Sequence, residues 1–229
     1  MNRILEVCLA GLSVVVSVAA ANTAAAQTLQ KGISVGMAVT KNAAPMPEAD
    51  SPDAWIVTIT AKGDLFFGLE SVTPEGLLEA MRSRPRNRLA KLYIKADAGA
   101  LFADVEKALQ AGPTVGFEEP VLLTSQPEQA APGTIVPPNG LEVLVAPSSS
   151  EAIMVHVLDT GVSKPAVRVN GADVSVDVLR NTLGRMLQTR KERLVVVKAA
   201  GTLRFAQVAE VIDACRGAGA RVGVGGPEL

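Results

Sequence analysis

Hydrophobic and polar positions alternate along the chain with strand-like and helix-like periods, and the elements that they predict occur twice in the same order. In the first half, residues 55–60 alternate as a strand, residues 62–64 form a turn, and residues 65–67 form a second short strand. These residues predict a β-hairpin.

A helix is predicted directly after this hairpin. Thr73 is a good N-cap, Pro74 suits the first helical position, and an apolar stripe runs from Leu77 to Met81 before Pro85 ends the pattern. Residues 89–95 then read as a strand, residues 101–111 as a second helix stopped by Gly112-Pro113, and residues 121–123 as a last strand.

The second half predicts the same elements. They are strands at 153–158 and 166–169, a helix from the Ser175 cap through Leu187, a strand at 194–197, a helix at 205–216 and a strand at 222–224. Each half is therefore a ββαβαβ unit. Because each helix carries a single apolar stripe, the expected fold is α/β of the α+β two-layer kind, with two helices on one face of a small mixed sheet.

Local sequence similarity supports an internal repeat. Residues 95–105 align with 198–208, residues 67–73 with 169–175, and residues 32–35 with 140–143. The predicted organisation is a first domain at 32–125, a Pro-rich linker at 126–139 and a second domain at 140–229.

The N-terminal residues predict export. Arg3 precedes an apolar run from Val7 to Ala21, and three alanines end at Ala26 in a pattern typical of signal-peptide cleavage. Since no charge occurs between Val7 and Gln30, an uncleaved membrane anchor is the alternative. Residues 1–26 are thus a signal peptide or an anchor, and the protein is expected in the periplasm or held at the inner membrane.

Composition limits the remaining possibilities. The chain of 229 residues has 22 basic and 23 acidic residues, so its overall charge gives no reason to expect a nucleic-acid partner. Cys8 and Cys215 are the only cysteines, and Cys8 lies in the export segment. No intrachain disulfide framework is expected.

In their order, these segments resemble the ExbD/TolR family of biopolymer transport proteins. In that family a glycine turn leads into a capped helix, a strand ends in a basic-acidic cluster, and an aromatic residue opens a helix that closes with Ala-Gly. The first unit matches through Gly68 to Leu78, Ile94 to Asp97, Phe102 to Val105 and Ala111-Gly112. The second matches through Asn170-Gly171, Val197 to Ala199, Phe205 to Val208 and Ala218-Gly219, with Ala200 where Asp97 would be.

The resemblance implies a non-enzymatic component or accessory of proton-motive-force-driven biopolymer (protein) transport across the envelope, with an ExbB/TolQ-like membrane protein or other envelope proteins as partners. Family domains commonly associate as dimers, so an intramolecular pseudo-dimer or a homodimer is expected. The family's membrane helix carries an aspartate within its apolar run, whereas the only acidic residue here is Glu6, near the start. This departure favours an accessory role over direct proton coupling.

Two clusters of cations are the candidate binding residues. Arg82, Arg84, Arg86 and Arg88 follow the first predicted helix, and Arg190, Lys191 and Arg193 occupy the same connection in the second unit. Cations at a helix C-terminus complement its dipole, and arginine also suits carboxylate ligands. The alternative function is therefore a free periplasmic module that binds peptidoglycan or a protein partner without motor coupling.

No pattern predicts catalysis, a metal or a cofactor. His156 is the only histidine, on a strand face opposite Val155 and Val157, and no cysteine or carboxylate stands at ligand spacing from it. The serines lack a nucleophile-elbow pattern. The glycines of residues 217–226 follow a helix instead of preceding one, so they do not form a phosphate-binding loop.

Overall fold

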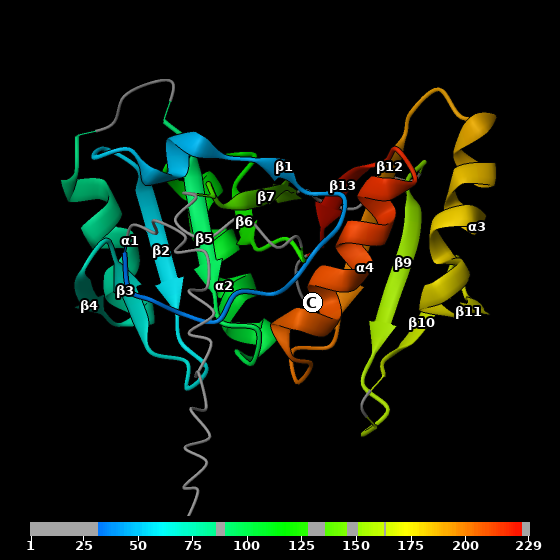
Figure 1. The fold of residues 1–229 in the computed structure, drawn as a ribbon, viewed down its shortest axis with the longest axis horizontal. Helices are drawn as coiled ribbons and strands as arrows, with labels where there is room; N and C mark the ends of the chain where they lie inside the picture. Colours follow the sequence, from blue (N-terminus) through cyan, green and yellow to red (C-terminus); the bar gives the residue numbers. More distant parts are fainter. Residues whose placement is uncertain (1–31, 86–89, 128–135, 146–150, 163, 226–229) are drawn as a thin grey trace, which may run out of the picture.

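The computed structural model describes residues 32–85, 90–127, 136–145, 151–162 and 164–225. These residues form two sheets and four α-helices (Figure 1), which confirms the predicted α+β two-layer class. The predicted export segment lies outside the described residues. Within the described part of the chain, no helix combines the length and apolar character needed to cross a membrane.

The first sheet has seven strands in the order β1-β7-β6-β5-β2-β3-β4. Strands β2 and β5 are parallel and fully buried, and β3 and β4 extend the sheet as an antiparallel meander. The strands are β1 (Ala44–Pro45), β2 (Trp55–Ile59), β3 (Leu65–Phe67), β4 (Glu70–Val72), β5 (Leu92–Ala96), β6 (Val121–Thr124) and β7 (Asn139–Glu142).

The second sheet has six strands in the order β11-β10-β9-β12-β13-β8. From β11 to β13 the order and directions match those of β4 to β6 in the first sheet. The strands are β8 (Leu144–Val145), β9 (Ile153–Leu158), β10 (Ala166–Val169), β11 (Ala172–Val174), β12 (Leu194–Ala199) and β13 (Arg221–Val224).

Strand registers define which residues of the two sheets correspond. Thr58 of β2 lies opposite Lys95 of β5, and His156 of β9 lies opposite Lys198 of β12. Lys95 and Lys198 are also the residues that the sequence alignment paired. The registers therefore make Thr58 equivalent to His156 as well.

Two helices pack on one face of each sheet. Apolar side chains of α1 and α2 contact the face of the first sheet that carries Val57 and Ile94, and α3 and α4 contact the corresponding face of the second. The helices are α1 (Pro74–Ser83), α2 (Phe102–Thr114), α3 (Val176–Gln188) and α4 (Phe205–Gly217).

Helix boundaries follow the sequence with two differences. Thr73 caps α1 as predicted, because its hydroxyl accepts from the Gly76 N–H at 3.0 Å. Ser175 forms no such side-chain bond, and Val178 N–H bonds to its carbonyl instead (3.2 Å). Helix α2 continues through Pro113 to Thr114, and the chain then turns at Gly116, where φ is +86°.

The segment 139–145 joins the two sheets. Strand β7 pairs antiparallel with β6 of the first sheet, and after Val143, which is buried, β8 pairs parallel with β13 of the second. The sequence predicts Asn139 in the linker and the start of the second unit at Gly140. The structure places residues 139–142 in the first sheet, where they cover the edge that β6 would otherwise expose.

The N-termini of α2 and α4 cap each other. The N–H groups of Phe102 and Ala103 donate to the carbonyls of Leu203 (2.8 Å) and Gly201 (3.1 Å). In the reciprocal arrangement, the N–H groups of Phe205 and Ala206 donate to the carbonyls of Ala100 (2.8 Å) and Ala98 (3.0 Å). Each helix thereby satisfies two of the N–H groups that a helix start leaves unbonded, and the two halves meet as in a two-fold dimer.

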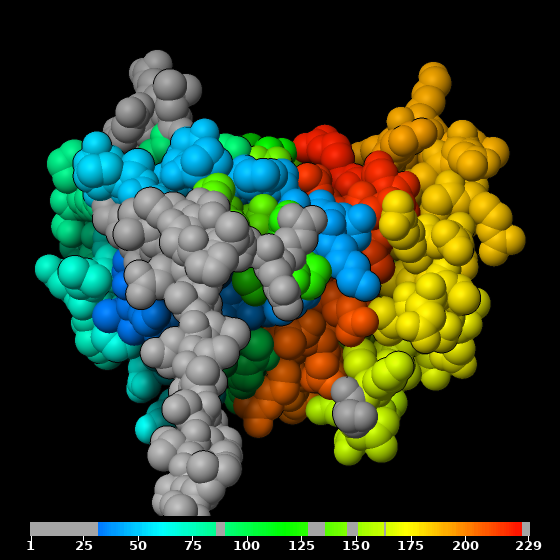
Figure 2. Space-filling view, viewed as in Figure 1, coloured from blue at the N-terminus to red at the C-terminus, as the bar shows by residue number. Residues whose placement is uncertain are grey.

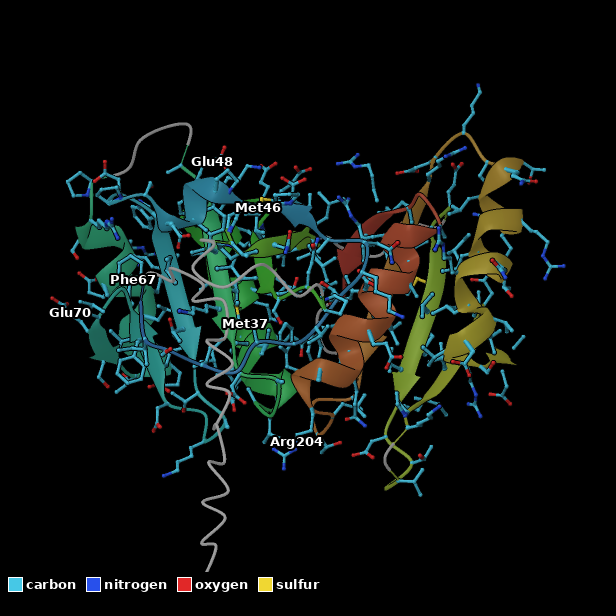
Figure 3. All side chains as sticks on the ribbon, viewed as in Figure 1. Met37, Met46, Glu48, Phe67, Glu70 and Arg204 are labelled. Carbon is cyan, nitrogen blue, oxygen red and sulfur yellow. The ribbon has the colours of Figure 1, made fainter. Side chains whose placement is uncertain are left out.

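Residues 35–54, here called the covering segment, pack on the opposite face of the first sheet. Met37, Met46 and Ala49 are buried there against Ile56 and Tyr93. The segment includes β1 and the 3-10 helix η1 (Pro47–Asp50). Figure 3 labels Met37 and Met46 on this segment and Arg204 where the two helix starts meet.

The covering segment also contacts the second half. Asp213 of α4 is 7% exposed, and its carboxylate accepts from the N–H of Lys41 (3.1 Å) and from the N–H (2.7 Å) and side-chain amide (2.9 Å) of Asn42. Figure 2 shows this blue segment running from the first half to the orange and red α4 region. The buried apolar side chains of the two halves also form one continuous core.

Candidate functional site

Among the predicted cluster residues that the structure describes, Arg84 is the one that lines a cleft. It follows α1 in an extended conformation (φ −88°, ψ 128°), so its side chain turns back over the start of β2. The guanidinium lies 5.2 Å from the ring centre of Trp55 and 5.6 Å from that of Phe67, and it donates to the Ala54 carbonyl at 3.4 Å. Cation–π contacts of this kind contribute about 0.5–2 kcal/mol and fix the orientation of the cation.

An aromatic cluster supports Arg84 from below. The Trp55 ring lies 5.5 Å from Phe67 and 5.2 Å from Phe117, with tilted planes, and all three side chains are buried. Tilted aromatic pairs at this separation add stability beyond their buried area. The guanidinium is thus held on a rigid apolar base.

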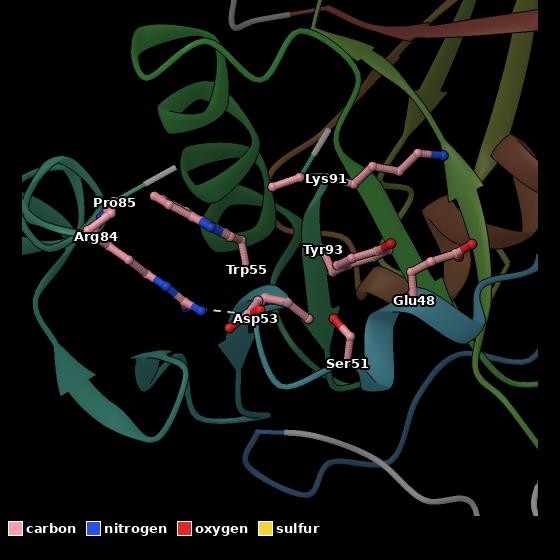
Figure 4. Close-up of a pocket in the computed structure, with 10 residues that line it drawn as sticks. Glu48, Ser51, Asp53, Trp55, Arg84, Pro85, Lys91 and Tyr93 are labelled. Carbon is pink, nitrogen blue, oxygen red and sulfur yellow. Dashed lines mark hydrogen bonds between the residues drawn. The ribbon is translucent and has the colours of Figure 1, made fainter. Parts of the chain in front are cut away.

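The cleft beside Arg84 has a volume of about 450 Å³. In Figure 4, Arg84 and Trp55 lie at one end, Tyr93, Glu48 and Lys91 at the other, and Asp53 and Ser51 between them. The cleft is lined by Glu48, Ser51, Asp53, Ala54, Trp55, Arg84, Pro85, Ala90, Lys91 and Tyr93. It offers a cation, carboxylates, hydroxyl groups and an apolar floor to one ligand.

Electrostatics distinguish the two cations of the cleft. Lys91 forms an ion pair with Glu142 at 2.6 Å, and this hydrogen bond raises the pKa of the lysine. Burial, helped by the nearby Glu48 carboxylate, raises the pKa of Tyr93, so its hydroxyl stays protonated and able to donate. Arg84 forms no ion pair with any residue that the structure describes. It is the cation best placed to meet a ligand carboxylate.

The other predicted binding residues that the structure describes do not line this cleft. Arg82 is exposed on α1, and Arg86 and Arg88 lie outside the described residues. Arg190 donates to the Glu151 carbonyl, and Lys191 and Arg193 are exposed after α3. Since α1 and α3 lie at opposite ends of the long axis in Figure 1, the described members of the two clusters are not brought together.

Sequence reasoning missed the partners of Arg84 in the cleft. Trp55 and Tyr93 are the only tryptophan and the only tyrosine in the chain, and both line this cleft. That rarity was a signal available from the sequence. The contribution of Glu48, Ser51 and Asp53 was not visible, because it depends on how the covering segment folds back.

A second, shallow hollow of about 410 Å³ lies on the other half. Arg180 and Arg185 project from α3 at its rim, and Arg180 donates to the Gly217 carbonyl at the end of α4 (3.0 Å). It lacks the aromatic floor of the first cleft, because its lining has no aromatic side chain. We therefore regard the Arg84 cleft as the principal candidate.

Potential catalytic groups do not converge in the described structure. Cys215 is fully buried, and burial raises the pKa of its thiol to about 12, which leaves the reactive thiolate scarce at neutral pH. His156 is half-buried on β9, far along the chain from the cleft residues. No cluster of three or more His, Cys, Asp or Glu suited to a metal occurs among the described residues.

A scan against protein-family models and a search of curated proteins found no match to this chain. The geometry of the cleft and of the contact between the halves therefore carries the functional argument.

Proposed function

We propose that this chain is a non-enzymatic cell-envelope protein built from two ExbD/TolR-like units, acting as a component or accessory of proton-motive-force-driven biopolymer transport. The supporting observation is the reciprocal capping of α2 and α4. Domains of that family pair with each other, and Phe102 with Leu203 and Phe205 with Ala100 make the matching two-fold contact inside one chain. The paired units would present one rigid body to an ExbB/TolQ-like partner in the membrane.

Co-purification of the full chain from envelope fractions tests this role. The chain, tagged at its C-terminus, is cross-linked in cells and purified, and the proposal expects a polytopic membrane protein in stoichiometric amount. A matched control replaces residues 1–26 with a cleavable signal from an unrelated exported protein. If the partner contact needs an N-terminal anchor, this control loses the partner. Recovery of only a soluble monomer from the unmodified chain would contradict the transport role.

The Arg84 cleft supports the second candidate function, binding of peptidoglycan. Peptidoglycan offers carboxylates that can pair with the Arg84 guanidinium. It also offers hydroxyl and amide groups for Tyr93 and Ser51, and sugar faces that can pack on the aromatic floor. A free periplasmic module of this type needs no motor. Export of the chain, which the N-terminal sequence predicts, is required for either function.

Retention on purified peptidoglycan separates the two functions. Arg84→Gln should weaken retention at low salt, whereas Arg82→Gln, which changes an exposed cation of the same helix, should leave it unchanged. Changing Arg82, Arg84, Arg86 and Arg88 together to Gln should also reduce the salt sensitivity. Equal retention of wild-type and Arg84→Gln protein would end the binding proposal while leaving the transport role untouched.

A further inference from the structure

Tyr93 brings an unpaired hydroxyl to the wall of the Arg84 cleft. Its side chain is 2% exposed, and the hydroxyl forms no hydrogen bond with any residue that the structure describes. Among those residues, Thr58 Oγ1 is the only buried side-chain polar atom that lacks both a partner and access to solvent. The Tyr93 hydroxyl is therefore not sealed in the interior, and Figure 4 shows it at the cleft. Because a buried tyrosine normally hydrogen-bonds through its hydroxyl, this group is available to a ligand.

Two carboxylates of the cleft also have no cationic partner. Glu48 and Asp53 line the cleft, and neither forms an ion pair within the described part of the chain. Lys91, the second cation of the cleft, already pairs with Glu142 at 2.6 Å. The cleft thus keeps negative charge that no direct contact with a lysine or arginine neutralises.

These charges follow one another along the cleft. The Arg84 guanidinium is fixed at one end by the Trp55 ring, 5.2 Å from its centre. Glu48 lies toward Tyr93, since its charge helps to raise the pKa of the tyrosine, and Figure 4 shows Asp53 between the two ends. A ligand that extends along the cleft therefore meets a cation first and carboxylates next.

This arrangement discriminates between classes of ligand. A ligand with only carboxylates would satisfy Arg84 but would place further negative charge beside Asp53 and Glu48. A ligand with only amino groups would leave Arg84 without a counter-charge and would be repelled by it. A ligand with a carboxylate and an ammonium group close together avoids both costs, and charge-assisted hydrogen bonds to both groups are the strong kind.

We propose that the cleft recognises the zwitterionic end of a diamino acid, an inference that rests on the peptidoglycan-binding function proposed above. The ligand carboxylate pairs with Arg84, and its ammonium group pairs with Asp53 and Glu48. The Tyr93 hydroxyl adds a neutral hydrogen bond. Peptide stems of peptidoglycan carry such an end wherever the diamino acid is not cross-linked, because its amino group and carboxylate then stay free on one carbon atom.

The fluorescence of Trp55 measures binding, because it is the only tryptophan in the chain and lies against Arg84. The full chain is titrated at constant ionic strength with meso-diaminopimelate, with pimelate, which lacks both amino groups, and with cadaverine, which lacks both carboxylates. Diaminopimelate should bind roughly tenfold more tightly than either of the others. Equal dissociation constants for diaminopimelate and pimelate would overturn the proposal.

Variants assign the two halves of the zwitterion. Arg84→Gln should raise the dissociation constant of diaminopimelate about tenfold, and Tyr93→Phe, which removes the hydroxyl alone, about threefold. The double change Glu48→Gln with Asp53→Asn should reduce the preference over pimelate to less than about twofold.

The matched control is Glu79→Gln, which removes an exposed carboxylate of α1 that does not line the cleft. It should leave the preference for diaminopimelate unchanged. Thermal unfolding verifies that each variant folds. An unchanged preference in the Glu48 and Asp53 double variant would exclude these carboxylates as the ammonium site and overturn the proposal.

Acetylation of the free amino groups of purified peptidoglycan separates this inference from the function on which it rests. Acetylation removes the ammonium groups and makes the polymer more negative, so retention of the wild type should fall. If Arg84 bound a carboxylate alone, retention would stay equal or rise. Equal retention on both polymers, lost in Arg84→Gln, would overturn the zwitterion and leave peptidoglycan binding intact. Retention on neither polymer would refute the binding function, and this inference with it.

Discussion

Phe102 and Phe205 begin two helices that are each capped by the other half of the chain. Both aromatic rings are fully buried, and each N–H donates across the contact at 2.8 Å, Phe102 to Leu203 and Phe205 to Ala100. The same two residues thus join the core of their own unit to the contact between the units. Disturbing either one should affect both halves together.

Replacement of Phe102 or Phe205 by Ala should lower the free energy of unfolding by about 3–5 kcal/mol, because each change leaves a large cavity in a shared core. Urea denaturation followed by circular dichroism measures the change. We expect a single transition in both variants. Wild-type stability in both would mean that these rings are not buried.

Gly201→Ala tests the contact between the halves directly. A Cβ at Gly201 would stand 2.9 Å from the Cβ of Ala103, so the two backbones must move apart. The expected loss is about 1–3 kcal/mol, from overpacking. Gly184→Ala in α3 is the control: its Cβ meets nothing within 4 Å, and it should stabilise the protein by about 0.5–1 kcal/mol. Equal melting shifts for the two variants would contradict the predicted contact.

Asp213→Ala should be strongly destabilising, although it removes a single carboxylate from α4. The change leaves the N–H groups of Lys41 and Asn42 without their acceptor, and because Lys41 is exposed to water the expected cost of about 1–3 kcal/mol comes mainly from Asn42. Glu210→Ala, at an exposed position of the same helix, should change stability by less than about 0.5 kcal/mol. Hydrogen exchange should show that residues 41 and 42 lose protection in the first variant alone.

The buried Lys95 should make the folded protein more stable as the pH rises. Burial lowers the pKa of its ammonium below the ordinary value of 10.5, so in the window between the folded and unfolded pKa values the unfolded chain binds more protons. The free energy of unfolding contributed by this group therefore increases as the pH rises through that window. In Lys95→Met the contribution is absent. The free energy of unfolding of the wild type, relative to that of Lys95→Met, should therefore increase as the pH rises through this window. Parallel plots of unfolding free energy against pH for the two proteins would refute the prediction.

Much of the fold was predictable because most elements carry their own local signals. The strands 153–158 and 166–169 match β9 and β10, and the Thr73 cap marks the start of α1. Strands β4 and β11 were missed because they are three residues long and mostly exposed, so alternation leaves little trace. They follow turns with positive φ at Gly68 and at Asn170-Gly171, and from the sequence these residues indicate only a turn.

The candidate site was predictable only in part. The position of Arg84 after a predicted helix made it a candidate. No local sequence signal indicates that it stacks on Trp55, because Trp55 lies in β2, far from Arg84 in the sequence. The role of residues 48–53 depends on long-range packing of the covering segment. Likewise, the placement of Asn139 in the first sheet results from the unpaired edge of β6, a property of the assembled sheet and not of the local sequence.

The short segment 139–145 has a mechanical consequence. A force that pulls on the C-terminal half is transmitted along the backbone from β8 through Val143 to β7, which belongs to the first sheet. Strand β8 holds the second sheet by two parallel pairs, Gly223 with Leu144 and Val224 with Val145, whereas β7 holds the first by four antiparallel pairs. Under tension β8 should therefore detach before β7, and the load would then pass to the shared core and to the reciprocal capping of α2 and α4, which still join the two halves.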